Sequence, residues 1–190
     1  MLSQPNAFTP ATTALEERLA TFLAVLGDLA LSGRVENQDV IVNVDPMNIR
    51  AVLTKLRDDE RSLLQVLPYM TAVDYSPREP RFDVIYDLNS LTHRHRCRVK
   101  CGLADTGSEE NLPVIDSVAD LYYAANWHER ECYDLFGIRF AGHPDLRRIM
   151  LPDRWDGHPL RRDYPFDGKR VWKIGATVVD GVEAEENLGL

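Results

Sequence analysis

The sequence predicts an α+β fold in which helices pack on one face of a small sheet, followed by a helix and a long irregular C-terminal arm. Apolar residues recur at helical spacing near the N-terminus, and they alternate with polar residues between 82 and 101. Glycine and proline then interrupt the chain repeatedly after 137, which excludes a long helix or strand there. We therefore expect three parts: a flexible N-terminus at 1–11, an α+β domain at 12–116, and a signature helix with an extended interaction arm at 117–190.

The first half of the domain is predicted to form a helix, a strand and a second helix. The run 40–44 is typical of a strand, and Asp45 followed by Pro46 predicts an N-cap with proline at the first helical position. The second helix would bury Ile49, Val52, Leu53 and Leu56. The first helix would end near Gly33 and bury a stripe of apolar side chains: Leu15, Leu19, Phe22, Leu23, Leu26 and Leu29.

The second half of the domain is predicted to be mostly strands. The run 63–67 predicts a short strand, and the alternation from 82 to 88 predicts a longer one that turns at Asn89 and Ser90. The next strand would begin at Leu91 and carry His93 and His95 on one face. These two histidines are close enough to share a ligand, but hydrogen-bonded histidines packed at a sheet face are the favoured interpretation.

Charge and cysteine content narrow the class of protein. The 190 residues carry a formal charge of −8, which argues against a general nucleic-acid binder. Between 139 and 173, however, nine Lys and Arg stand against five Asp, so this segment is basic in an otherwise acidic chain. Three cysteines are too few for a disulfide framework and fit a reducing, cytoplasmic compartment. The longest apolar stretch, 19–31, is broken by Thr21, Gly27 and Asp28, so we expect no transmembrane helix.

The segment 126–165 is the densest in charged and aromatic residues. Ser117 and Asp120 resemble a capping box that opens a helical stretch toward it. A helical projection places Trp127, Arg130, Glu131 and Asp134 on one face. The favoured interpretation is that the two carboxylates bind arginine side chains, although an acid/base pair is an alternative. An arm with so many arginines and so little regular structure is suited to binding across another protein.

Zinc binding is a rival interpretation of the same helix. The run His128-Glu129-Arg130-Glu131-Cys132 is nearly a zincin motif, in which His128, Cys132 and His143 would be ligands and Glu129 the base. The motif lacks its usual last ligand, and a single helical cysteine is more often a small apolar residue of the core. The sequence thus keeps a zinc hydrolase as a remote alternative.

Three runs within 129–165 resemble the signature of the 30 kDa subunit of respiratory complex I, the enzyme called NADH-quinone oxidoreductase in bacteria. These runs are ERECYDLFGIRF, GHPDLRRIMLPD and GHPLRRDYP. Cys132 and Arg162 depart from the expected pattern, in which a small or β-branched residue and a lysine would stand.

The resemblance implies a core subunit of the peripheral arm that binds no cofactor itself and acts as a scaffold. In the complex, electrons pass from NADH through FMN and Fe-S clusters to quinone, coupled to proton translocation. The implied partners are the 49 kDa-type subunit, which forms the quinone cavity, and the neighbouring quinone-site Fe-S subunit. The chain would lie on the cytoplasmic side of the bacterial inner membrane, attached only through the complex. The equivalent subunit of a membrane-bound hydrogenase, formate or reduced-deazaflavin dehydrogenase complex is the alternative.

The resemblance also implies interface or structural roles, and no catalytic, cofactor or metal role, for the residues of the signature. An acidic tail with Asp180, Glu183, Glu185 and Glu186 would be either solvated or bound to a partner. The interface or structural residues are Trp127, Glu129, Arg130, Glu131, Asp134, Gly137, His143, Pro144, Arg147, Arg148, Pro159, Arg161, Arg162, Asp163 and Pro165.

Overall fold

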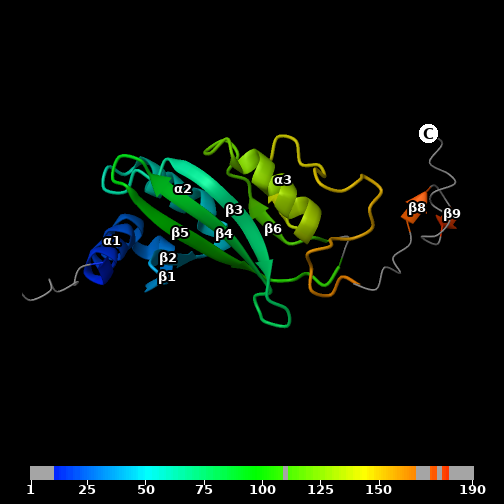
Figure 1. Ribbon diagram of the computed structural model, residues 1–190, viewed down its shortest axis with the longest axis horizontal. Coiled ribbons are helices and arrows are strands. Elements are labelled where there is room, and N and C mark those ends of the chain that lie inside the picture. Colours follow the sequence, from blue (N-terminus) through cyan, green and yellow to red (C-terminus); the bar gives the residue numbers. More distant parts are fainter. Residues whose placement is uncertain (1–10, 109–110, 166–171, 175–176, 180–190) are drawn as a thin grey trace, which may run out of the picture.

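A five-stranded mixed sheet forms the centre of the computed structural model (Figure 1). The structure describes residues 11–108, 111–165, 172–174 and 177–179. The sheet has the order β1-β2-β5-β4-β3, in which only β2 and β5 pair in parallel. Its strands are β1 (Ala30–Glu36), β2 (Asp39–Val44), β3 (Val66–Asp74), β4 (Phe82–Ser90) and β5 (His95–Leu103).

Three helices and two small strand pairs complete the described elements. Helix α1 (Ala11–Leu26) leads through the 3-10 turn η1 (Gly27–Leu29) into β1, and η2 (Pro46–Asn48) leads into α2 (Ile49–Asp58). Helix α3 (Ala125–Phe136) lies between β6 (Val114–Asp116) and β7 (Arg139–Ala141), which pair in parallel. Strands β8 (Trp172–Ile174) and β9 (Thr177–Val179) pair antiparallel.

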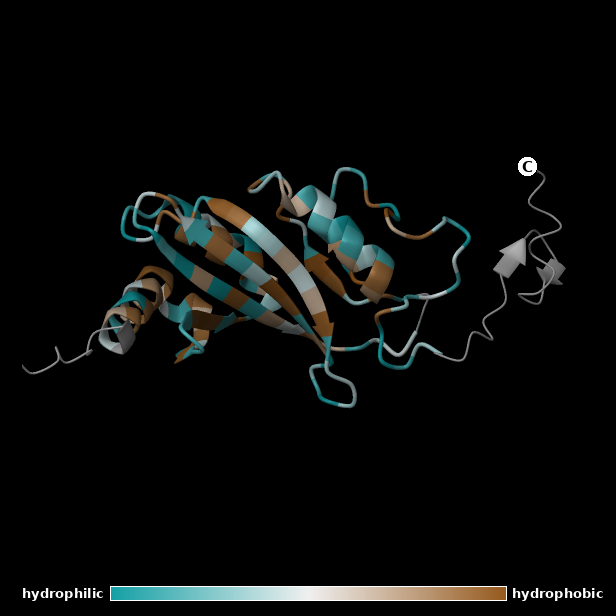
Figure 2. Ribbon diagram, viewed as in Figure 1, coloured by the Kyte–Doolittle hydropathy of each residue, from teal (hydrophilic) through white to brown (hydrophobic). Residues whose placement is uncertain are grey.

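One face of the sheet carries the core. Along β4 the side chains of Phe82, Val84, Tyr86 and Leu88 are fully buried, whereas those between them are half-buried. The same apolar cluster includes residues of α1, α2 and α3. The alternation is visible as brown and pale bands along the strands (Figure 2). The predicted α+β class, with helices on one sheet face, is therefore confirmed.

The N-terminal prediction was wrong about where the first helix ends. Helix α1 stops at Leu26, and β1 occupies the residues that were expected to continue the helix toward Gly33. Gly27 has φ +58°, a left-handed conformation that ends the helix and that glycine adopts without steric cost. Leu29 and Leu31 continue the apolar spacing beyond that turn, so periodicity alone did not detect the break.

Two boundaries in the rest of the sheet also differ from the prediction. Strand β3 runs over Val66–Asp74, whereas the sequence predicted a strand at 63–67. The turn between β4 and β5 spans 91–94, so His93 lies in the turn and not on a strand. The Nε2 atoms of His93 and His95 lie 2.8 and 2.7 Å from the carbonyl oxygens of Glu60 and Ser62. The two histidines thus hold the β4–β5 turn against the loop before β3, as the hydrogen-bonded interpretation expected.

The connections before α2 and α3 show one correct and one wrong prediction. Asp45 accepts a hydrogen bond from the Met47 N–H (2.8 Å), and Pro46 begins η2, so the predicted cap is confirmed. Ser117 does not open a helix, because 117–124 contains only turns and irregular backbone and α3 begins at Ala125. The predicted domain limits stay a prediction; the pairing of β6 with β7 joins the two parts across the boundary at 116.

From 142 to 165 the chain forms no helix or strand, and it runs along α3 (Figure 1). This agrees with the expected irregular arm, and we refer to 142–165 as the arm. Residues 1–10 of the expected flexible N-terminus, and Asp180, Glu183, Glu185 and Glu186 of the acidic tail, lie outside the described residues.

Two buried tyrosines of the core lead to opposite predictions. The Tyr122 hydroxyl donates to the Leu64 carbonyl (2.8 Å), whereas the Tyr86 hydroxyl has no hydrogen-bond partner among the described residues. We expect Tyr122→Phe to lower the free energy of unfolding by about 1 kcal/mol, and Tyr86→Phe to leave it unchanged or raise it. Urea denaturation of both variants measures this. Equal destabilisation by the two substitutions would contradict it.

Candidate functional site

Helix α3 divides its side chains between the core and the surface. Glu129, Cys132 and Phe136 are buried against the sheet and the turn at 117–118, whereas the Trp127 side chain is 61% exposed. The helix ends at Gly137, whose φ of +67° fits the left-handed C-terminal position. A Cβ at Gly137 would lie 2.4 Å from the ring of His158, so the close approach of the arm also requires glycine.

Asp134 binds the arm to α3. One of its carboxylate oxygens accepts three consecutive backbone N–H groups, from Ile149 (3.0 Å), Met150 (2.7 Å) and Leu151 (2.9 Å). The other accepts from Arg148 Nη1 at 2.7 Å. Burial acts against the charged form, but these donors hold the pKa of Asp134 below its usual range. The predicted contact between Asp134 and an arm arginine is confirmed.

The arm also satisfies the carbonyl groups at the C-terminal end of α3. Arg161 Nε donates to Phe136 O (2.7 Å) and its Nη2 to Gly137 O (3.2 Å). His158 Nδ1 lies 2.8 Å from Asp134 O, and Leu160 N–H donates to Leu135 O. These four carbonyls would otherwise be unpaired at a helix end, where a cation is also favoured. The arm therefore acts as the C-terminal cap of α3.

A second set of ion pairs, centred on Arg81, connects the arm to the sheet. No role had been predicted for Arg81 from the sequence. Its guanidinium group, 7% exposed, donates to both oxygens of Asp74 (3.0 and 2.6 Å) and both of Asp163 (2.9 and 2.8 Å). A third carboxylate, from Asp105, accepts at 2.7 Å. Burial opposes ionisation of Asp74, but the hydrogen bonds from Arg81, Arg162 N–H and Ser76 N–H hold its pKa at about 2.

Two signature side chains do not make the predicted arginine contacts. Arg130 donates to the carbonyl oxygens of Arg147 and Arg148 (both 3.2 Å) and lies over the Trp127 ring, where a pair with a helix carboxylate was expected. The Glu131 carboxylate is 46% exposed and lies 4.0 Å from His128 Nδ1. Helical spacing located the face correctly, but it did not show that backbone groups of the arm would be the partners of Arg130.

The remaining signature residues lie along the arm. Arg147 pairs with Asp145 (2.9 Å) at the surface, and Arg162 donates to Ser76 O (2.9 Å). Arg148 reaches Trp155 O and Gly157 O, both at 3.2 Å, so it also closes a loop of the arm. Pro159 is half-buried, whereas Pro144 and Pro165 are exposed.

The four residues of the zinc interpretation have other contacts. Cys132 is 1% exposed in the core, and burial raises the pKa of its thiol well above the usual range. His128 faces Tyr69 and Glu131. His143 Nδ1 accepts the Asp145 N–H (3.0 Å), so its Nε2 carries the proton and donates to Asn126 O (3.1 Å). The described residues contain no group of three or more His, Cys, Asp or Glu that could hold a metal.

Glu129 is fully buried between α3 and the turn at 117–118. Its oxygens accept from the Ser117 hydroxyl (2.6 Å) and the Val118 N–H (2.7 Å), and Oε2 lies 4.0 Å from His143 Nε2. Burial raises the pKa of this carboxyl to about 7, and the Ser117 and Val118 donors oppose the rise only in part. Ser117 had been considered only as a helix cap, so its role as a partner of Glu129 was missed.

The raised pKa of Glu129 predicts a pH dependence of stability. The native state binds this proton more tightly than the unfolded chain, so the stabilisation is complete below pH 4.5 and is lost as pH rises toward 7. The loss should be no more than about 3 kcal/mol. Glu129→Gln should remove it, because the amide oxygen can accept from Val118 and the amide N–H can donate to Ser117 Oγ. Denaturation between pH 5 and 8 tests this, with the half-exposed Glu131→Gln as control; the same pH slope in Glu129→Gln and wild type would contradict it.

Comparison with known proteins finds a matching family model and similar proteins with related names. The family model described as "Respiratory-chain NADH dehydrogenase, 30 Kd subunit" matches residues 42–170. An NADH-quinone oxidoreductase subunit of Roseiflexus castenholzii is 44% identical over 80% of this chain and 85% of its own. A probable mitochondrial NADH-ubiquinone oxidoreductase 30.4 kDa subunit of Candida maltosa is 45% identical over 70% of this chain and 46% of its own.

Solved structures resemble the same fold. A trypsin-resistant fragment of Nqo5 is 26% identical, with a TM-score of 0.50 over 70% of this chain and 97% of the fragment. A chain of an archaeal membrane-bound sulfane sulfur reductase is 24% identical, with a TM-score of 0.63 over 80% of this chain and 86% of its own, and shows the fold alone. None of the described helices has the length and apolar character needed to cross a bilayer. Because the family model matches most of the sequence and similar proteins align over most of its length, the chain belongs to the family of the 30 kDa subunit of respiratory-chain NADH dehydrogenase.

Proposed function

We propose that this chain is a non-catalytic scaffold subunit in the peripheral arm of a proton-translocating NADH:quinone oxidoreductase. It would bind the 49 kDa-type subunit that forms the quinone cavity and the neighbouring Fe-S subunit, on the cytoplasmic side of the bacterial inner membrane. FMN, Fe-S clusters and quinone would be held by other chains. The two relatives from Roseiflexus and Candida are named for NADH, which favours this donor over those of related hydrogenase or deazaflavin complexes.

One observation carries the proposal: the charged side chains of the signature are mostly used within the chain, while aromatic ones beside them are left at the surface. Asp134, Arg148 and Arg161 bind the arm and helix to each other. By contrast, Tyr123 is 95% exposed, Trp127 61% and Tyr69 50%, and the Met150 side chain is 66% exposed. Exposed Trp and Tyr are enriched among the residues that dominate protein–protein binding.

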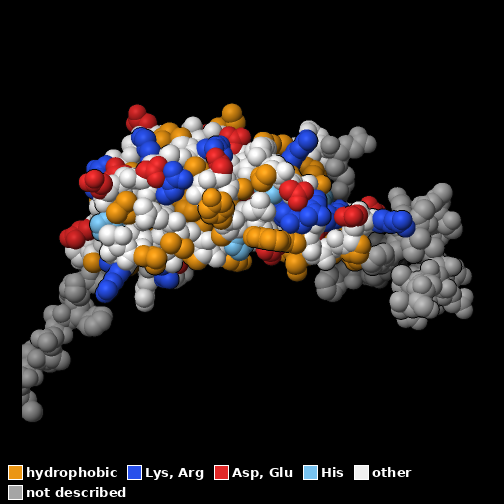
Figure 3. Space-filling model, turned by 90° about the horizontal axis from the view of Figure 1, so that it is seen from above, with side chains coloured by type: hydrophobic (Ala, Val, Ile, Leu, Met, Phe, Trp, Pro, Cys, Tyr) orange, Lys and Arg blue, Asp and Glu red, His pale blue; other side chains and the backbone are white. Residues whose placement is uncertain are grey.

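The exposed rings of Tyr69, Tyr123 and Trp127 lie around the N-terminal half of α3, and we call these three residues the aromatic surface. Tyr123 and Trp127 are four residues apart along the helix start, and the Tyr69 ring packs edge-on to His128 at 5.9 Å. Arg130 lies over Trp127 at 5.3 Å and fixes the orientation of its ring. In the view from above, hydrophobic side chains lie among charged ones of both signs (Figure 3). Such a mixed surface suits a subunit interface.

The test is affinity purification of the tagged full chain from native membranes, with identification of its partners. An NADH-binding flavoprotein and the two quinone-site subunits should co-purify with wild type, and their recovery should fall strongly for a Tyr123→Ala, Trp127→Ala double variant. Leu31→Ala, which alters an equally exposed residue of β1 (67%), is the matched control. Recovery of the chain alone, or with hydrogenase or deazaflavin subunits, would refute the proposal.

A further inference from the structure

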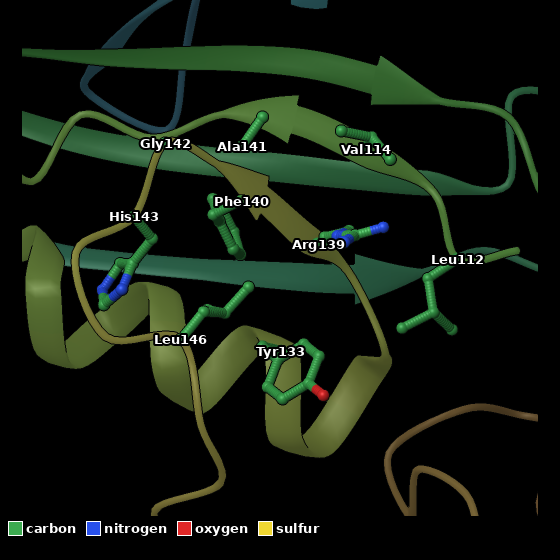
Figure 4. Close-up of a pocket in the computed structure, with 9 residues that line it drawn as sticks. All are labelled: Leu112, Val114, Tyr133, Arg139, Phe140, Ala141, Gly142, His143 and Leu146. Atoms are coloured by element: carbon green, nitrogen blue, oxygen red, sulfur yellow. The ribbon is translucent and has the colours of Figure 1, made fainter. Parts of the chain in front are cut away.

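A groove separates α3 from the β6–β7 pair, and none of the residues that line it belongs to the aromatic surface. It has a volume of about 670 Å³, and Figure 4 shows the residues that line it. Tyr133 reaches it from α3, Val114 from β6, Arg139 and Phe140 from β7, and Leu146 from the arm. Leu112, Ala141, Gly142 and His143 complete the lining.

The groove is held open by contacts that are complete within the chain. His143 is fixed at both ring nitrogens, by Asp145 N–H and Asn126 O, so the start of the arm cannot fold into the groove without losing these bonds. Tyr133 is held on its other side by an edge contact with the ring of His158, at 6.4 Å. A cavity whose walls are already fixed binds a partner with little ordering cost.

Arg139 is the one formal charge among the described residues of this lining. The side chain is exposed, and its guanidinium group has no hydrogen bond or ion pair within the described part of the chain; its backbone N–H donates to Pro113 O. Nearby arginines differ, because Arg130, Arg148 and Arg161 all donate to groups of the chain. No carboxylate lies among the described lining residues, so the positive charge of Arg139 needs an anionic group from the occupant. A carboxylate fits, because a guanidinium group binds it through two parallel hydrogen bonds.

The remaining lining is largely apolar. Leu112, Leu146 and Tyr133 are half-buried, and Val114 is 50% exposed at the groove mouth. An occupant therefore needs apolar side chains along its length as well as one carboxylate. Since the groove is open to solvent at Val114 and Arg139, an extended polypeptide can lie across it without entering an enclosed cavity.

We propose that this groove receives an extended segment of another subunit of the complex, with apolar side chains against Leu112, Val114 and Leu146 and an Asp or Glu paired with Arg139. This inference rests on the proposed function, because it takes the occupant to be a protein of the same complex. It adds a second docking site, made of different residues from the aromatic surface, and states the chemistry that the site selects.

The test is photo-crosslinking in the assembled complex, with p-benzoylphenylalanine introduced at Val114 and, separately, at Leu146. Both positions should capture the same segment of a partner protein, and mass spectrometry should find an acidic residue flanked by apolar ones in it. Arg139→Glu should reduce the crosslinked fraction at least about tenfold, as loss of a charge-assisted pair implies. Arg154→Glu, a charge reversal of an exposed arm residue outside the groove, should leave it unchanged.

Two further measurements distinguish the possible outcomes. Replacing the captured acidic residue by Arg should restore crosslinking in the Arg139→Glu background. If the chain assembles into the complex but crosslinks only to itself, to a basic segment, to a small molecule or to nothing, the groove proposal is wrong and the proposed function stands. If the wild-type chain enters no such complex, the proposed function itself fails.

Discussion

Arg81→Met is expected to be the most destabilising single substitution that we predict for this chain. It removes the guanidinium group that three carboxylates share and leaves Asp74, 1% exposed, without its main counter-charge. Breaking a buried ion pair by removing one partner costs about 3–5 kcal/mol. Because Asp163 belongs to the arm, the same substitution should also release the C-terminal end of the arm from the sheet.

Urea denaturation at pH 7 measures the effect, with Arg34→Met as the control. Arg34 pairs with Glu36 at the surface, where both side chains are about half exposed, so its loss should cost less than about 1 kcal/mol. The loss in free energy of unfolding caused by Arg81→Met should become smaller at acidic pH. The depressed pKa of Asp74 stabilises the native state above pH 3.8, and this contribution is lost as pH falls through about 2. Equal effects of the two substitutions at pH 7 would contradict the role of Arg81.

Asp134→Asn is expected to detach the middle of the arm from α3. If the amide oxygen keeps the three N–H groups of 149–151, the amide nitrogen must face Arg148 Nη1, which places two donors opposite each other. Hydrogen bonds to a charged group contribute about 1.5–3 kcal/mol each, so we expect a loss of about 2–4 kcal/mol in the stability of the arm.

The matched control is Asp145→Asn, which alters an exposed carboxylate of the arm that pairs with Arg147. It should change stability by less than about 1 kcal/mol. Limited proteolysis reads out the arm directly: cleavage within 149–165 should accelerate in Asp134→Asn and not in Asp145→Asn. Cleavage of the two variants at the same rate would show that the Asp134 contacts do not hold the arm.

The general fold could be predicted because its signals are local. Alternation along β4 and the stripe of α2 each depend on neighbours a few residues apart, and burial confirms both. The missed strand β1 follows a turn at Gly27 that depends on backbone conformation, which apolar spacing does not report.

The site could be predicted only in part, because its partners are distant in sequence. Helical projection placed Asp134 on the face that the arm covers, and the contact with Arg148 spans 14 residues. The Arg81–Asp163 contact spans 82 residues, and no local pattern marks either residue as a partner of the other. Arg130 shows a further limit, since backbone carbonyls have no signature in a sequence.

The internal contacts of the signature also bear on how the family motif should be interpreted. A dense set of Asp, Glu and Arg first indicates an acid/base site. However, Asp134 binds backbone N–H groups of the arm, and Arg161 binds a carbonyl at the end of α3. Substituting these residues would therefore disturb the arm that presents Met150 and the groove, and so affect assembly indirectly. Trp127, Tyr123 and Arg139 are the better probes of partner binding, because their side chains are exposed.

The central claim is that the arm is folded onto α3 by the chain itself, and amide hydrogen exchange of the isolated full chain tests it most directly. The N–H groups of Ile149, Met150 and Leu151 lie in no helix or strand, yet all three donate to Asp134. They should exchange slowly in wild type and rapidly in Asp134→Asn, while amides of β4 stay protected in both. Exchange of these three amides at unprotected rates in the wild-type chain would contradict the account.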